Sequence, residues 1–196
     1  MILPRALVLL ALLPPANPVA MAPGDALAAE AAPTTTRDLN RNTVLERLYG
    51  DLSVAPSPGA AQPLADAIWR LWLEAPDAEA QALMDRAVEE RRAGAYDDAI
   101  AILDELTAGW PSYAEGWNQR ATLFFLQGRL GPSLADVATV LRLEPRHFGA
   151  LAGRALILFR QGQHDAANRT LLEALRVHPW LPERGLLDPA YREERL

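Results

Sequence analysis

The chain has 196 residues, of which half are apolar and 22% are charged, so it is long enough to fold as one domain around a buried core. Its net charge of −6, with the 19 basic side chains interleaved with acids, excludes the basic face that nucleic-acid binding requires. The lack of cysteine excludes disulfides, thiolate metal sites and cysteine nucleophiles.

The first 28 residues have the pattern of a secretory signal. Arg5 precedes the apolar run 6–13, which two prolines end and which is too short to span a bilayer. Small residues offer cleavage sites after Ala22 or Ala28. We therefore expect a signal peptide over 1–28, export to the periplasm of a Gram-negative bacterium, and no stable membrane insertion after cleavage. A disordered or membrane-skimming N-terminus is the alternative.

The next segments predict a flexible lead-in over 29–38 and then two helices. Apolar residues near helical spacing indicate one helix over 39–52. The proline-rich stretch 55–63 predicts a break, after which 64–74 forms a second helix whose Trp69 and Trp72 must be largely buried. Segment 39–79 reads as a degenerate repeat that caps the stack described next.

Glycine and proline recur with a fixed period of 34 residues, which indicates a stacked repeat. The positions are Gly94, Gly128 and Gly162, followed by Pro111, Pro145 and Pro179. Each interval between these residues has the length of one helix, so the chain divides into helix pairs at 80–113, 114–147 and 148–181. Each glycine can adopt the left-handed conformation that ends a first helix, and each proline ends a second.

Within each pair, small residues mark the faces through which the two helices approach each other. The first helices carry a large residue with an alanine four positions later, namely Leu83 with Ala87, Trp117 with Ala121, and Leu151 with Ala155. The second helices carry Ala99, Ser133 and Ala167 at the matching position. Residues four apart share one helix face, so each small residue predicts a close helix–helix contact.

These positions together resemble the tetratricopeptide repeat over residues 80–181. The resemblance implies an all-α fold, a right-handed superhelix of helix-turn-helix units, and a function in binding proteins. Residues 68–72 (IWRLW) and 144–153 (EPRHFGALAG) are more specifically similar to exported tetratricopeptide proteins of α-proteobacterial type. The remaining segment, 182–196, is expected to form a C-terminal cap or tail in which Leu186, Leu187 and Tyr191 cover the last pair.

The first helices of such a stack line its concave side, which predicts a groove for a peptide or a partner helix. The residues expected to face this groove are Met84, Val88, Arg91, Asn118, Thr122, Phe125, Ala152, Leu156, Phe159 and Arg160. They combine apolar side chains with arginines that could meet a carboxylate. In the alternative, the helix over 39–52 occupies the groove and these residues are core.

The sequence offers no recognisable catalytic or metal site. His147, His164 and His178 share no helix face at ligand spacing, so we interpret them as surface or capping residues. We therefore predict a non-catalytic scaffold or protein-binding module that needs no cofactor, with an oligomeric state that the sequence leaves open. The alternatives are a self-capped structural unit that assembles by stacking, and an enzyme with an unrecognised site.

Overall fold

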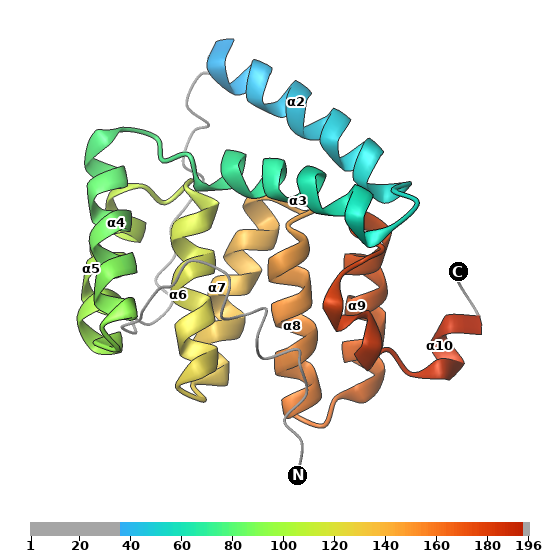
Figure 1. Cartoon of the computed structure of the whole chain (residues 1–196). Coiled ribbons are helices and arrows are strands. Elements are labelled where there is room, and N and C mark those ends of the chain that lie inside the picture. Colours follow the sequence, from blue (N-terminus) through green and yellow to red (C-terminus); the bar gives the residue numbers. More distant parts are fainter. Residues whose placement is uncertain (1–35, 194–196) are drawn as a thin grey trace.

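A computed structural model describes residues 36–193, which form helices and turns without a strand. The predicted signal peptide, its cleavage sites and residues 29–35 of the lead-in lie outside the described residues. Six helices stand side by side, α3 runs along the row over the upper ends of α6–α9, and α2 lies on α3 (Figure 1). The all-α prediction is confirmed.

The row consists of three helical hairpins that follow one another along the chain. Their helices are α4 (Ala78–Arg92) with α5 (Tyr96–Gly109), α6 (Ala114–Leu126) with α7 (Leu130–Leu143), and α8 (Phe148–Arg160) with α9 (His164–Val177). The two helices of each hairpin pack most closely on each other, and α5 packs on α6 as α7 packs on α8. The arrangement is that of a tetratricopeptide-type α-solenoid, as the sequence predicts.

The three periodic glycines end the first helix of each hairpin. Gly94, Gly128 and Gly162 have φ angles of 77°, 74° and 72°, the left-handed region in which a side chain is strained. The glycine amide donates back into the helix it ends, as from Gly128 to the Phe125 carbonyl at 3.0 Å. The chain then turns into the second helix within a few residues.

The small residues lie at buried helix contacts. Ala87, Ala99, Ala121, Ala155 and Ala167 are each at most 2% exposed. Ser133, at the position of an alanine, donates from Oγ to the Ala121 carbonyl at 2.7 Å, so its hydroxyl is satisfied in the interior. These contacts explain why large residues are excluded there.

A buried ion pair that the sequence did not reveal joins the first two hairpins. Arg120 of α6 donates to both carboxylate oxygens of Asp136 in α7 at 2.8 Å, and to Asp104 of α5 at 2.6 Å. Its guanidinium also lies over the Trp117 ring, 4.7 Å from the centroid. Burial raises the pKa of Asp136, and the Arg120 charge opposes that effect. Arg120 therefore positions three helices at once.

The helices before the repeats begin and end differently from the prediction. Helix α2 spans Thr36–Ser53, and α3 spans Pro58–Leu73. The predicted break at 55–63 is thus too long, because Ser57 caps α3 by accepting from the Ala60 amide and Pro58 fits the first helical turn. Pro63 lies inside α3, on its exposed side, at the cost of one backbone hydrogen bond.

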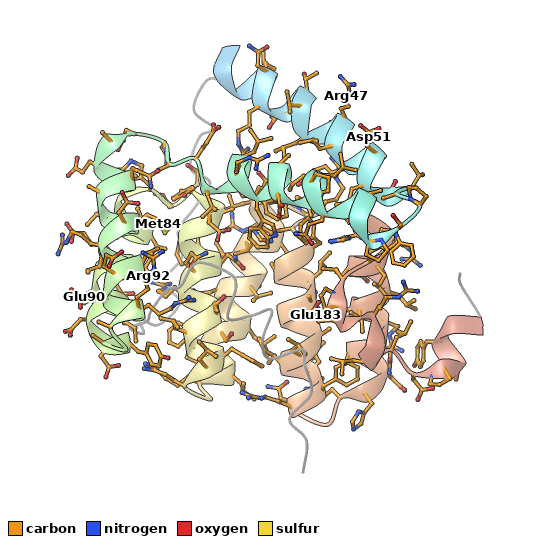
Figure 2. All side chains as sticks on the ribbon, viewed as in Figure 1. Arg47, Asp51, Met84, Glu90, Arg92 and Glu183 are labelled. Atoms are coloured by element: carbon orange, nitrogen blue, oxygen red, sulfur yellow. The ribbon has the colours of Figure 1, made fainter. Side chains whose placement is uncertain are left out.

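Helices α2 and α3 share one hydrophobic core with the last hairpin. Their buried side chains Leu45, Tyr49, Leu52, Ile68 and Trp72 cluster with Phe148, Leu151, Leu172 and Leu175 of α8 and α9. This placement corrects the prediction that segment 39–79 precedes the stack as a capping repeat. The exposed side of α2 carries Arg47 and Asp51, which point away from the other helices (Figure 2), together with exposed Leu39 and Val44.

The two ends of the row are closed in different ways. At the first hairpin, α4 presents exposed Glu79, Arg86 and Glu89, so it needs no apolar cover. At the last hairpin, a 3-10 helix (Pro182–Leu186) and α10 (Pro189–Glu193) follow α9. Leu187 is buried there, and Tyr191 Oη donates to Asp165 at 3.0 Å. None of the helices within 36–193 combines the length and apolarity needed to cross a bilayer.

Candidate functional site

The concave surface made by the first helices is the candidate site, and the structure divides its ten predicted residues by exposure. Met84, Asn118, Thr122, Phe125 and Ala152 are buried, Val88, Arg91, Leu156 and Phe159 are half-buried, and Arg160 is exposed. Half of the predicted set therefore belongs to the interior. We call the remaining five residues the open end of the concave surface.

Phe125 is a core residue, which corrects its assignment to a groove floor. Its side chain is 4% exposed and clusters with Ala121, Val137 and Ile157 between the second and third hairpins. Arg160 closes over it, donating to the Phe125 carbonyl at 3.1 Å with its guanidinium 4.1 Å from the ring centroid. Adjacent first helices approach so closely here that the ring is enclosed between them.

Helix α3 covers the other end of the concave surface. Trp72 stacks on His147 with ring centroids 3.8 Å apart and planes 9° from parallel. Trp69 lies edge-on to Trp72, His147 and Phe148, and its ring meets the backbone of Gly149. The alternative in which the helix over 39–52 fills the groove is wrong for the described chain, because α3 supplies this cover while α2 lies on α3 and α9.

A buried polar network lies under α3 at this covered end. The Glu115 carboxylate, in a residue 1% exposed, accepts from the side-chain amides of Asn118 and Gln119 and from His147 Nε2 at 3.1 Å. His147 Nδ1 accepts from the Ala150 amide, so the ring proton is on Nε2 and points at Glu115. Asn118 therefore holds a structural carboxylate and is not available to a partner.

The three histidines occupy three different environments. His147 caps α8, as expected, and is also fully buried. His164 is exposed. His178 is buried against Phe148, with ring centroids 5.1 Å apart, and burial lowers its pKa to about 4. His178 is the C-cap residue of α9, with its amide donating to the Ala174 carbonyl at 2.9 Å, so the capping interpretation fits its position although its ring is buried. Within residues 36–193, histidine and acidic side chains nowhere gather into a set that could hold a metal ion.

The open end combines apolar surface with positive charge. Val88 and Arg91 lie on α4, and Leu156, Phe159 and Arg160 lie on the last two turns of α8. Partial burial lowers the pKa of Arg91 to about 10, which still leaves the guanidinium charged near pH 7. Phe159 also contacts His164 across the turn, with ring centroids 6.0 Å apart. Arg91 and Arg160 lie on helices that α6 separates, and either guanidinium could pair with a partner carboxylate next to an apolar group.

Comparison with known proteins agrees with this architecture. No family model matches the chain. A TPR repeat-containing protein of Rhizobium etli is 38% identical over 138 residues, which cover 69% of this chain and 66% of the relative. The chain belongs to the tetratricopeptide-repeat (TPR) family. The match extends over slightly less than two thirds of the relative, and that protein's name records the repeat and no partner. TPR repeats are commonly used for protein–protein interaction, which makes protein binding the function to test for this chain.

Proposed function

We propose that this TPR protein is a non-catalytic module that binds a protein partner at the open end of its concave surface. The observation that carries the proposal is the division of that surface: α3 closes one end, and the other keeps Arg91, Phe159 and Arg160 within reach of a partner. A partner peptide or helix would place an apolar or aromatic side chain near Phe159 and a carboxylate near Arg160.

The charge of the protein and its expected compartment limit the classes of partner that it could bind. The net charge of −6 disfavours nucleic acid, whereas Arg91 and Arg160 on this surface favour an acidic segment of a protein. We also propose that residues 1–28 direct export, so that the partner is met in the periplasm. The mass of the protein recovered from the cell envelope tests this step, because an unprocessed chain would contradict cleavage near residue 22 or 28.

The binding proposal is tested by selecting peptides from a displayed random library with the purified protein. We expect selected sequences that combine acidic and apolar residues. Their affinity, measured by fluorescence polarisation, should fall at least about tenfold in Arg160→Glu, because the reversed charge repels the acidic group. Arg154→Glu is the matched control, since Arg154 is an exposed arginine of the same helix outside the predicted groove set.

The outcomes separate the alternatives. If no peptide is enriched, or if the Arg160 and Arg154 variants bind equally, the open end is not the binding surface. A concentration-dependent increase in mass without peptide binding would favour the self-assembling structural unit instead. The melting temperature of each variant is measured alongside, because Arg160 also contacts the Phe125 carbonyl.

A further inference from the structure

A cavity of about 400 Å³, which shares no residue with the open end, lies where α2 and the end of α3 meet the first two hairpins. Its principal lining residues are Arg41, Trp72, Glu74, Tyr113, Glu115 and Glu144. They come from α2, α3, the linker to α4, the turn before α6, the first turn of α6 and the C-cap of α7. The cavity is therefore built by residues distant in sequence, at the junction between the repeat array and its non-repeat cover.

The charges around the cavity are unequal. Its lining contains three carboxylates and a single guanidinium. The guanidinium of Arg41 reaches across from α2 to Glu144, with Nη1 and Oε1 3.1 Å apart, and also donates to the Leu71 carbonyl at 3.4 Å. Arg41 is thus paired with Glu144, and the concave shape concentrates the negative potential of Glu115.

Glu115 gives the cavity wall a buried carboxylate without an arginine partner among residues 36–193. Within that part of the chain its carboxylate accepts from the amides of Asn118 and Gln119 and from the imidazole of His147, whose other nitrogen is an acceptor. None of these donors carries a formal positive charge, although Glu115 is almost completely buried. A buried carboxylate without a cation is costly, and a positively charged ligand in the adjoining cavity would offset that cost.

Two aromatic side chains complete the wall. Trp72 and Tyr113 are both nearly buried and both line the cavity. Burial is the main cause that raises the pKa of Tyr113 well above its ordinary value, and the nearby Glu115 charge is the second. The phenol therefore remains neutral, and it donates a hydrogen bond to the Leu73 carbonyl at 3.0 Å. Aromatic rings beside carboxylates form the surroundings in which proteins hold guanidinium and ammonium groups.

We propose that this cavity binds a guanidinium or alkylammonium group, supplied by a small free amine or by a basic side chain of a partner. The resident Arg41 occupies part of the same space and shows that these walls accept a guanidinium. The site is separate from the open end of the concave surface and does not rest on the function proposed for it. The cavity would give the protein a second recognition surface, which binds a cation, whereas the open end binds an acidic group.

The test is isothermal titration calorimetry of the full-length protein with two probes, agmatine and the blocked peptide acetyl-Gly-Arg-Gly-amide. We expect saturable binding of at least one probe and no binding of succinate. Affinity should fall about fivefold or more in Glu144→Gln, because a carboxylate of the wall is neutralised at nearly constant shape. Glu105→Gln, which neutralises an exposed acid of α5, is the matched control and should bind as the wild type does.

If Glu144→Gln does not fold stably, a second variant still tests the proposal. Arg41→Ala removes the resident guanidinium, so agmatine should bind it more tightly than the wild type and raise its melting temperature. Tighter binding of the peptide than of agmatine identifies a partner side chain as the source, and the reverse order identifies a free amine. Absence of saturable binding in both wild type and Arg41→Ala, or equal affinity in wild type and Glu144→Gln, overturns the proposal. Arg160→Glu, which tests the open end, should leave cation binding unchanged.

Discussion

The two ends of the concave surface are both built by first helices of the repeats, yet they have become different structures. At the covered end, Glu115 and Asn118 lie in a buried network under Trp72, while at the open end Phe159 and Arg160 remain accessible. The repeats fix where each side chain points, but the helices outside the repeats decide whether solvent can reach it. Exposure in a repeat protein is therefore a property of the whole chain and not of the repeat.

The largest effect on stability is expected from truncating the buried Phe125, and it should exceed that of truncating the half-buried Phe159. Phe125→Ala should lower the free energy of unfolding by about 3–5 kcal/mol, because it leaves a cavity between two hairpins. Phe159→Ala, at a half-buried position, should cost clearly less and should weaken peptide binding instead. Urea denaturation of the two variants measures the difference. Equal losses of stability would show that Phe159 is also core and that the open end is smaller than proposed.

A smaller effect is expected from His178, whose burial should make the stability of the protein depend on pH. The pKa of His178 is about 4 in the folded chain and near 6.5 when unfolded, so the unfolded state binds more protons between these values. Stability should therefore be complete above about pH 6.5 and fall as pH decreases toward 4, by up to about 3 kcal/mol.

His178→Phe is the control for this pH dependence. No group in the described part of the chain hydrogen-bonds to His178 Nδ1, and an aromatic ring can keep the contact with Phe148. The difference in unfolding free energy between wild type and variant, followed from pH 7 to pH 4 by urea denaturation, isolates this residue from the other titrating groups. A difference that does not change with pH would show that His178 is hydrated in the folded protein.

Local signals predicted the repeats well. The three left-handed glycines, the buried alanines and the hairpin boundaries each depend on residues within one turn or one helix pair, and these appear in the sequence at a fixed period. The Arg120 network was not predicted, because nothing local indicates that Asp104 and Asp136 lie on either side of one arginine. The burial of Phe125 was missed because it depends on how closely α6 approaches α8.

The position of α3 was the main error, and one residue carried a signal for it. Trp69 and Trp72 need a large apolar surface to pack against. From the sequence alone we expected them to be buried in a capping repeat at the start of the stack. Gly149, in the first turn of α8, lowers helix stability and so indicates that something approaches the backbone there. The structure shows that Trp69 is the approaching group.

Two glycines of α8 provide the most direct test of that close approach. A Cβ added to Gly149 would lie 2.7 Å and 2.9 Å from carbon atoms of the Trp69 ring, whereas one added to Gly153 would meet nothing within 4 Å. Trp69 cannot easily yield, because its ring is held edge-on against Trp72, His147 and Phe148. Gly149→Ala should therefore destabilise the protein by about 1–3 kcal/mol. Gly153→Ala should stabilise it by about 0.5–1 kcal/mol, because alanine favours the helix and the site has room. Thermal unfolding of both variants gives the comparison, and stabilisation by both would mean that α3 does not rest on α8 at this point.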